Sequence, residues 1–287
     1  MGGGELRGWL CLVGLVLVAH AVSLGIRQLG IGGVRIASGN NNDADQYDTE
    51  RFDSTPWEPI GRFKDVDTFV KHVPGSKLHA FRGTTFFEGV HISSAMSHFY
   101  DVSLASEWID MLDVIREYSY PIPTQAAPSD LSDEKDRLTY DQEFYKQTRS
   151  ARKLAPLTES LRDVDLVYEV MRLPWPVAPR DILLRREWNY DYDNRSVTVR
   201  YHSVEDPIRL PLKPGTVRAW SPHTLWVFRS TPKGTHVEIE CLVDSRGSIP
   251  ALLINFFQRS FPSKALTAFR ALVKKSKVPP HKRVQDW

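Results

Sequence analysis

Cysteine is nearly absent from this sequence, which holds two, Cys11 and Cys241, among 287 residues. The two lie far apart, so neither a disulfide framework nor a cysteine-based metal site follows from them. The motifs HExxH, GxSxG and CxxC and the Walker loop are missing as well. We therefore expect no metal, no cofactor and no catalytic residues, and we predict that the chain is not an enzyme.

A surplus of one charge sign is also lacking, since 37 Lys and Arg against 35 Asp and Glu give a formal net charge of +2. Such a balance offers no general case for binding nucleic acid or an acidic substrate. Aromatic residues, in contrast, are plentiful, with 8 Trp, 13 Phe and 10 Tyr. They either line a pocket or fill a large core.

One long hydrophobic run extends from Trp9 to Ile26, with no charge and one histidine. Its length is at the lower limit for crossing a bilayer, and the Ala-His-Ala triplet at 19–21 fits a cleavage site. Residues 1–36 are therefore either a cleaved signal peptide or an uncleaved membrane anchor. Basic residues lie on both sides of the run, so charge counting leaves its orientation open.

Two stretches are too polar to contribute much core. Residues 37–55 have an asparagine run, several aspartates and almost no aliphatic side chains, which predicts a flexible linker. Residues from about 121 to 163 form a charged insertion, expected to be an exposed helix or partly disordered.

Before the insertion the pattern is mixed. Alternation predicts a strand over His79–Glu88, with Phe81, Gly83, Thr85 and Phe87 on one face. Ser93 or Ser94 is expected to cap a helix, followed by a helical stretch over 104–112 and a short strand over 114–118.

After the insertion the pattern is strongly β. Alternating strands are predicted at 166–173, 182–188, 197–203, 217–220, 225–230 and 236–244. Their short connections favour an antiparallel meander. A C-terminal helix is then expected, capped by Ser248 and kinked or broken at Pro262. The fold class is thus α+β, a curved antiparallel sheet wrapped around a long C-terminal helix, with side chains or a ligand between them.

The run VYEVMRLPWPVAPRDILLRREW at 167–188 resembles the central signature of START (steroidogenic-acute-regulatory-protein-related lipid transfer) domains. In that family a strand ends in a Pro-Trp-Pro-like turn followed by an Arg-Asp pair, here Arg180 and Asp181. Three further blocks follow in the family's order, at 201–204, 215–219 and 244–250. The last two contain Arg218, Asp244 and Gly247, for which we expect structural roles.

The resemblance implies a helix-grip fold over residues 56–278, enclosing an apolar cavity for one lipid or sterol. It also implies a buried acidic–basic pair in that cavity, for which the matching positions are Glu169 and Arg186. The expected ligand-binding residues on the sheet are Glu169, Arg186, Trp188, Tyr201 and Trp226.

The resemblance further implies that the C-terminal helix acts as a lid. Its apolar residues either close the cavity or pack in the core, and they are Ile249, Leu252, Leu253, Phe256, Phe257 and Phe261. The basic residues near the C-terminus either touch anionic lipid headgroups or are solvated, and they are Lys274, Lys275, Lys277, Lys282 and Arg283. Residues 279–287 are expected to be a tail.

These observations predict non-catalytic binding of a single lipid or sterol and its transfer between membranes, with a lipid ligand and a membrane surface as partners. The alternatives are a membrane-tethered regulator that senses lipid and, less favoured, a helix-grip enzyme. A membrane-associated chain with a cytosolic domain is expected, because START domains usually work there. If the signal is cleaved instead, the domain is lumenal or secreted, and the sequon at Asn194 is available for glycosylation.

Overall fold

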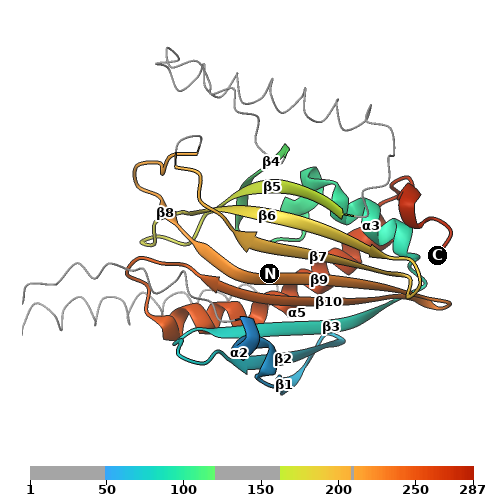
Figure 1. Ribbon diagram of the computed structural model, residues 1–287, viewed down its shortest axis with the longest axis horizontal. Helices are drawn as coiled ribbons and strands as arrows, with labels where there is room; N and C mark the ends of the chain where they lie inside the picture. Colours follow the sequence, from blue (N-terminus) through green and yellow to red (C-terminus); the bar gives the residue numbers. More distant parts are fainter. Residues whose placement is uncertain (1–48, 120–161, 208–209) are drawn as a thin grey trace, which may run out of the picture. The chain divides into compact units, whose positions relative to one another are not determined.

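Figure 1 shows the computed structural model, which describes residues 49–119, 162–207 and 210–287. The predicted signal or anchor, most of the linker and nearly all of the charged insertion lie outside these residues. No helix in the described part of the chain is both long and apolar enough to cross a membrane.

A large sheet and one long helix dominate the domain. The elements are α2 (Thr49–Ser54), β1 (Glu58–Phe63), β2 (Val66–His72), β3 (His79–Glu88), α3 (Ile92–Tyr100), η2 (Val102–Glu107), β4 (Leu112–Ser119), β5 (Arg162–Met171), β6 (Arg180–Asp191), β7 (Ser196–Ser203), β8 (Val217–Arg218), β9 (Trp220–Thr231), β10 (Gly234–Asp244), α5 (Ala251–Lys275) and η3 (Lys282–Val284).

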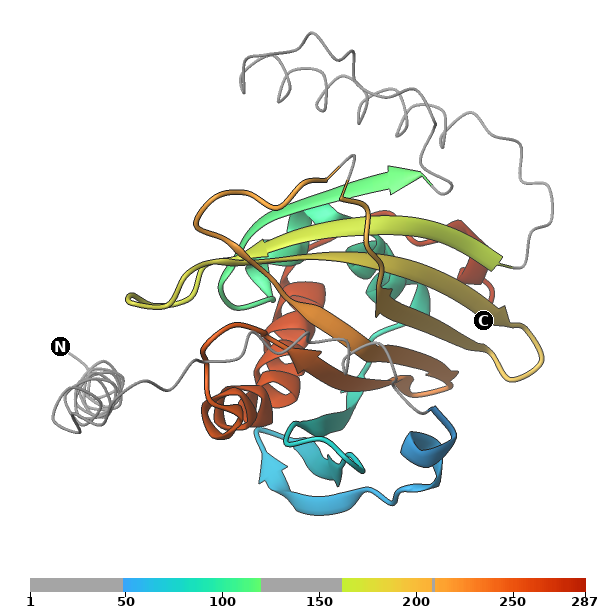
Figure 2. The same cartoon turned by 60° about the vertical axis from the view of Figure 1, so that its left-hand side comes forward.

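The strands form one sheet in the order β1-β2-β3-β10-β9-β7-β6-β5-β4. Neighbours along this order pair antiparallel, and the short β8 pairs parallel with β6. Figures 1 and 2 show the sheet curving around α5. The predicted antiparallel sheet around a long C-terminal helix is therefore confirmed. The face toward α5 is called the inner face below.

Strand β3 shows why the helix lies where it does. The predicted face of β3 is buried, whereas Phe86 and Glu88 between those positions are exposed. Gly83 lies beneath α5, and a Cβ placed on it would be 2.7 Å from the Cβ of Pro262 and 3.1 Å from Leu266 Cδ1. The missing side chain thus permits close approach of helix and sheet.

The prediction that Pro262 kinks or breaks the last helix was wrong in so far as a break was expected. Helix α5 runs as one element from Ala251 to Lys275 with Pro262 inside it. Proline in a helix interior costs about 3 kcal/mol or more, because it removes a hydrogen bond and crowds the previous turn. Here its ring is buried against Gly83, so packing on the sheet offsets that cost.

The predicted helix caps were also wrong. Pro250, not Ser248, precedes α5, and it makes no side-chain cap. His91 caps α3 by accepting a hydrogen bond from the Ser93 N–H on its imidazole. Serine hydroxyls are common caps, but the helix begins at Ile92, so Ser93 lies inside its first turn and His91 is the residue in the capping position.

The helical stretch expected over 104–112 is shorter and begins earlier. It is the 3₁₀ helix η2, whose first turn is capped by the Asp101 carboxylate accepting from Ser103 N at 3.0 Å. Strand β4 begins at Leu112, so the predicted strand at 114–118 is confirmed with slightly wider bounds.

The end of the predicted linker is ordered structure. Residues 49–54 form α2, and Phe52 is buried with Ala80 and Leu242 on the face of the sheet opposite α5. The ammonium of Lys71 donates to the Phe52 carbonyl at 2.9 Å and lies 4.0 Å from the Phe52 ring centroid. Phe52 thus packs the start of the domain against the sheet. The average composition of residues 37–55 is polar and does not reveal this single buried phenylalanine.

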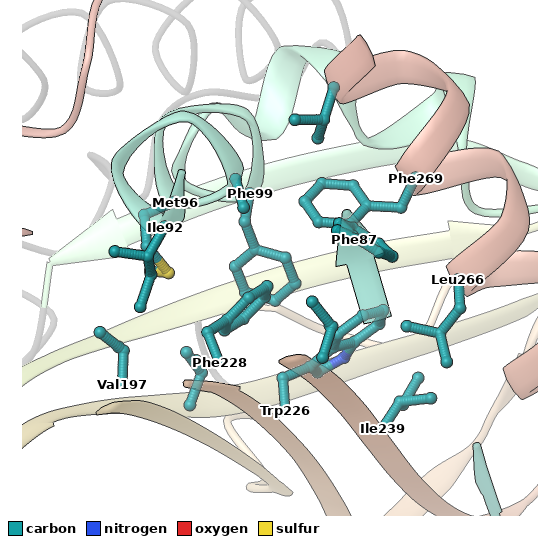
Figure 3. Close-up of a cluster of buried hydrophobic side chains, with 14 of the residues drawn as sticks. Phe87, Ile92, Met96, Phe99, Val197, Trp226, Phe228, Ile239, Leu266 and Phe269 are labelled. Carbon is teal, nitrogen blue, oxygen red and sulfur yellow. The ribbon is translucent and has the colours of Figure 1, made fainter. Parts of the chain in front are cut away.

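Aromatic rings fill the space between α3, α5 and the inner face (Figure 3). Phe99 is central, with its ring centroid 5.0 Å from that of Trp226, 5.1 Å from Phe228 and 5.9 Å from Phe269. Of the two interpretations of the aromatic supply, core packing holds for this cluster.

The C-terminal segment 279–287 packs on the domain. Val284 is fully buried, the Pro279 carbonyl accepts from Ser97 Oγ at 2.6 Å, and the Arg283 guanidinium lies 5.0 Å from the centroid of the Tyr190 ring. The four predicted basic residues that precede Arg283 are exposed, namely Lys274, Lys275, Lys277 and Lys282.

Substituting Gly83 tests the close approach. We expect Gly83→Ala to lower the free energy of unfolding by about 1–3 kcal/mol, because the new methyl overlaps Pro262. Urea unfolding measures the change, and Glu88→Ala, at an exposed position of the same strand, is the control. Equal stability of Gly83→Ala and the control would contradict the packing described here.

Candidate functional site

The inner face carries a group of polar side chains at the β4–β5–β6 side of the sheet. Strand register places Arg186 directly opposite Asp165 on β5 and Tyr201 on β7. Glu169 lies opposite Ile182 on β6 and Ile115 on β4, on the same face of β5 as Asp165 because strand residues alternate.

Arg186 is paired twice. Its Nε donates to Asp165 Oδ1 at 2.8 Å and its Nη2 to Asp165 Oδ2 at 2.6 Å, and Nη2 also bonds to Glu117. The side chain is 2% exposed. Burial alone would lower the pKa of Arg186, but the two carboxylates outweigh it and hold the pKa well above its ordinary value.

The predicted pair of Glu169 with Arg186 is therefore not the direct contact. Asp165 and Glu117 take that role, because each lies closer to Arg186 in the register than Glu169 does. Both were missed by sequence reasoning. The signal available for Asp165 was its period-two spacing from Glu169 on the predicted strand, whereas Glu117 comes from a strand across the insertion.

The carboxyl of Glu169 is desolvated, although the residue is not fully buried. Desolvation raises the pKa of its carboxyl from 4.5 to about 7, and attraction to Arg186 offsets this rise only in part. The residue as a whole nevertheless keeps some accessible surface.

The other predicted sheet residues divide between this polar group and the core. Tyr201 is half-buried beside Ile182 and Leu184, and burial raises the pKa of its hydroxyl. Trp188 is fully buried, 4.9 Å from the Arg186 guanidinium. Trp226 belongs to the aromatic core around Phe99.

The motif residues hold the loops at one end of the sheet. Arg180 donates to the carbonyls of Ala178, Ser245 and Arg246 at 2.6–3.1 Å, and so ties β6 to the loop before α5. Gly247 in that loop has φ +73°, and a Cβ placed on it would lie 3.3 Å from Arg180 Nη2. The Asp244 carboxylate accepts from Arg246 N at 2.8 Å.

Asp181 points to the opposite face from Arg180 and does not pair with it. Its carboxylate accepts two bonds from Arg218, at 2.8 and 3.0 Å, and one from the Tyr168 hydroxyl at 3.0 Å. These contacts join β5, β6 and β8.

The N-terminal half of α5 presents apolar side chains to solvent. Leu252 is 79% exposed, Phe256 60% and Phe257 44%. Ile249, Leu253 and Phe261 are half-buried. The C-terminal half, in contrast, buries Leu266, Phe269 and Leu272 in the core.

Two amide side chains, which sequence reasoning missed, attach this N-terminal half to the sheet. Asn255 accepts from His79 N and donates to Lys77 O, both at 2.9 Å. Gln258 accepts from Val243 N at 3.3 Å and donates to Val243 O. They are called the amide clips below.

A surface pocket of about 420 Å³ lies elsewhere, between the β1–β2 turn, the η2–β4 loop and α5. None of the predicted ligand-binding residues lines it. Within the described ranges, no cluster of three or more His, Cys, Asp or Glu could hold a metal ion.

Comparison with known proteins identifies the fold. The family model described as START domain matches residues 132–278, about half of the chain. Human STARD10 superposes with a TM-score of 0.56 at 17% identity, covering 82% of this chain and 80% of that one. A STAR-related lipid transfer protein from Xanthomonas axonopodis gives 0.55 at 20% identity, covering 76% and 99%. Human StAR-related lipid transfer protein 5 gives 0.55 at 14%, covering 79% and 90%.

One curated relative is similar in sequence. An uncharacterised protein of Pseudomonas aeruginosa is 30% identical over 111 residues, which are 38% of this chain. The match spans about half of that protein's length, 52%.

Removing Arg186 tests the buried ion group. Arg186→Leu leaves Asp165 and Glu117 without their cation, so we expect a loss of about 3–5 kcal/mol in unfolding free energy. The neighbouring Arg185→Leu breaks a half-exposed pair with Glu187 and is the matched control, with an expected loss under about 1 kcal/mol from that pair. Thermal and urea unfolding of both variants measures the two losses in unfolding free energy. Equal losses in Arg186→Leu and Arg185→Leu would contradict the account.

Glu169 should make stability depend on pH. Its raised pKa means that the unfolded chain releases the proton first, so its contribution is present below about pH 4.5 and is lost as pH rises through 7. Relative to wild type, Glu169→Gln should therefore gain up to about 3 kcal/mol of stability between pH 4.5 and 8. Urea unfolding across this range measures the gain. A stability difference independent of pH would mean that Glu169 is not desolvated.

Proposed function

Because the chain belongs to the START-domain family, we propose that it binds a single lipid or sterol and carries it between membranes without catalysing a reaction. The proposed site lies between the inner face of the sheet and α5. The proposal extends the role named for two structural neighbours, both lipid transfer proteins, to a chain that shares their fold at 14–20% identity.

The observation that carries this proposal is the state of Glu169. A carboxyl that is desolvated yet partly accessible fits the wall of an internal cavity, where a ligand would replace water. Its cross-strand neighbours on the inner face are apolar, namely Ile115 and Ile182, and Val167 and Leu184 lie beyond them toward the ion group of Arg186. Water exposure of lipid chains costs about 25 cal/mol per Å², so a carrier needs such an enclosed surface.

The lid in this proposal is the N-terminal half of α5. The amide clips hold it to the ends of β3 and β10, whereas the C-terminal half is fixed by core packing and by Gly83. Opening of residues 251–261 would release these four hydrogen bonds together with the packing of the buried Ile254 and the half-buried Phe261, while the C-terminal half stays in the core. Pro262 lies at the boundary between the two halves. Ligand entry then needs only local opening.

Weakening the clips should speed lipid exchange. We expect Asn255→Leu to raise the rate of lipid transfer between liposomes several-fold, because the lid loses two of its four bonds. Global stability should fall by only about 1–2 kcal/mol. Lys274→Ala, at the exposed end of the same helix, is the control. Lipid transfer by Asn255→Leu at the wild-type rate would mean that the amide clips do not limit opening of the lid.

We further propose that the membrane contacts the end of the domain where the lid begins. Trp175 in the β5–β6 loop is 85% exposed, and Arg180 ties this region to the loop before α5, whose Leu252 and Phe256 are also exposed. Exposed Lys213 and Arg259 supply positive charge on adjoining segments. Apolar side chains beside basic ones suit an anionic bilayer surface.

Liposome binding tests this surface. Trp175→Ala and Phe256→Ser should each weaken binding to phosphatidylserine-containing liposomes about tenfold, since a buried large apolar side chain contributes roughly 1.5–3 kcal/mol. Phe63→Ser is the matched control, because Phe63 is 53% exposed in β1, outside this surface. Sedimentation with liposomes gives the affinities. Equal losses in all three variants would place the membrane contact elsewhere.

For localisation we propose that residues 9–26 anchor the chain and that the domain faces the cytosol. The Asn194 sequon lies in the β6–β7 turn, where its side chain bonds Asp191 at 2.7 Å. A cytosolic domain stays unglycosylated, so a glycosidase should cause no mass shift in the cellular protein. A shift that disappears in Asn194→Gln would instead establish the lumenal alternative.

A further inference from the structure

Two histidines face each other at the hairpin end of β2 and β3. Strand register places His72 directly opposite His79, and alternation puts both on the inner face, which also carries Phe81. His72 Nδ1 and His79 Nε2 lie 3.2 Å apart, and the two rings meet edge to face with their centroids separated by 4.3 Å. A hydrogen bond between two imidazole nitrogens requires a lone pair on one of them, so at least one ring is neutral.

The separation of these two nitrogens suits a transition-metal ion. In a tetrahedral site with metal–nitrogen bonds of about 2.0–2.1 Å, two ligand nitrogens lie about 3.3–3.4 Å apart. The two rings therefore need only turn until both lone pairs meet at one point, and the proton that they share is released to water. The side chain of His72 is 56% exposed, which leaves room for the rings to turn and for water to complete the coordination.

Glu58 lies where an outer carboxylate of such a site would lie. Its position on β1 is directly opposite Val70, which precedes His72 by two residues and shares its face. Glu58 Oε2 is 3.9 Å from His72 Nε2, the ring nitrogen that does not contact His79. Ligating histidines commonly turn their second nitrogen toward a carboxylate, which fixes the ring and makes it a better ligand. Three neighbouring strands thus supply two ligand nitrogens and a group that orients one of them.

The hairpin that bears the histidines also holds the lid. Asn255 accepts a hydrogen bond from the backbone N–H of His79 and donates one to the carbonyl of Lys77. A metal ion bound to both histidines would favour the hairpin in this register, which is the state in which the clip can form. Because a ligand stabilises the conformation that it binds, and because such coupling is reciprocal, the bound ion would favour the closed lid.

We propose that His72 and His79 chelate a divalent transition-metal ion that prefers imidazole, such as Zn²⁺, Cu²⁺ or Ni²⁺, and that the bound ion holds the lid closed. The metal site itself is independent of the proposed function, whereas its effect on the lid rests on that function. Two imidazoles leave the remaining coordination positions to water. Ca²⁺ and Mg²⁺ prefer oxygen ligands and do not suit this site.

Calorimetric titration of the full 287-residue chain, prepared without a histidine tag, tests the site. One Zn²⁺ or Cu²⁺ ion should bind per chain, Cu²⁺ more tightly, and Mg²⁺ should not bind. His72→Asn and His79→Asn should each lower the affinity for Zn²⁺ by at least about tenfold, because removing a ligand costs no less than removing its outer partner. His202→Asn, which removes a histidine from β7, is the control and should leave the affinity unchanged.

A spectroscopic measurement separates coordination from a structural role of the histidines. The electron paramagnetic resonance spectrum of bound Cu²⁺ should show two imidazole nitrogens in the wild-type chain and one in either variant. Two nitrogens in His72→Asn would place the ion elsewhere.

Amide hydrogen exchange of residues 251–261 tests the effect on the lid, because it measures local opening without a lipid. Saturating Zn²⁺ should slow this exchange several-fold in the wild-type chain and should not slow it in His72→Asn. Asn255→Leu keeps both histidines but lacks their clip, so it should bind Zn²⁺ without slower exchange of the lid.

Each outcome decides one claim. Absence of Zn²⁺ and Cu²⁺ binding, or an affinity that neither histidine variant lowers, would overturn the metal site. Zn²⁺ binding without slower exchange of residues 251–261 would overturn the effect on the lid while the site stands. Neither result involves lipid uptake, so a failure of the proposed lipid binding would be seen separately.

Discussion

The approach of α5 to the sheet at Gly83 is the constraint on which the rest of the structure depends. Because Gly83 has no side chain, Pro262 and Leu266 lie directly on the inner face, and the C-terminal half of the helix joins the aromatic core around Phe99. The N-terminal half then extends past the aromatic core and leaves Leu252, Phe256 and Phe257 exposed. The close approach at Gly83 therefore divides a continuous helix into a part anchored in the aromatic core and a part held by the amide clips and the buried Ile254.

The polar group on the inner face follows from strand register. Asp165, Arg186 and Tyr201 are direct neighbours across three strands, so their contact is fixed by the same pairing that builds the sheet. Buried ion pairs add little net stability but are costly to break, because removing one partner leaves an unpaired charge.

The periodicity of the sequence was sufficient to predict the strands, but not the side-chain contacts between strands. The face of β3 and the antiparallel meander after the insertion follow from alternation alone, because alternate residues must face a core. Of the two carboxylates that pair with Arg186, Asp165 had a signal in its spacing from Glu169, whereas Glu117 had none. Glu117 lies on a strand before the charged insertion, and local periodicity does not give the register between strands that an insertion separates. The caps at His91 and Pro250 failed for a related reason, because cap propensities are averages and tertiary packing overrides them. The short helix α2 depends on a single phenylalanine in a polar stretch.

The central claim is that the domain encloses one lipid, and native mass spectrometry of residues 47–287, one compact unit, tests it most directly. The protein would be purified from cells without added lipid, weighed intact and then extracted. The account predicts one co-purifying lipid or sterol per chain, or its stoichiometric uptake from mixed liposomes. A bare protein mass that remains unchanged after incubation with those liposomes would contradict it.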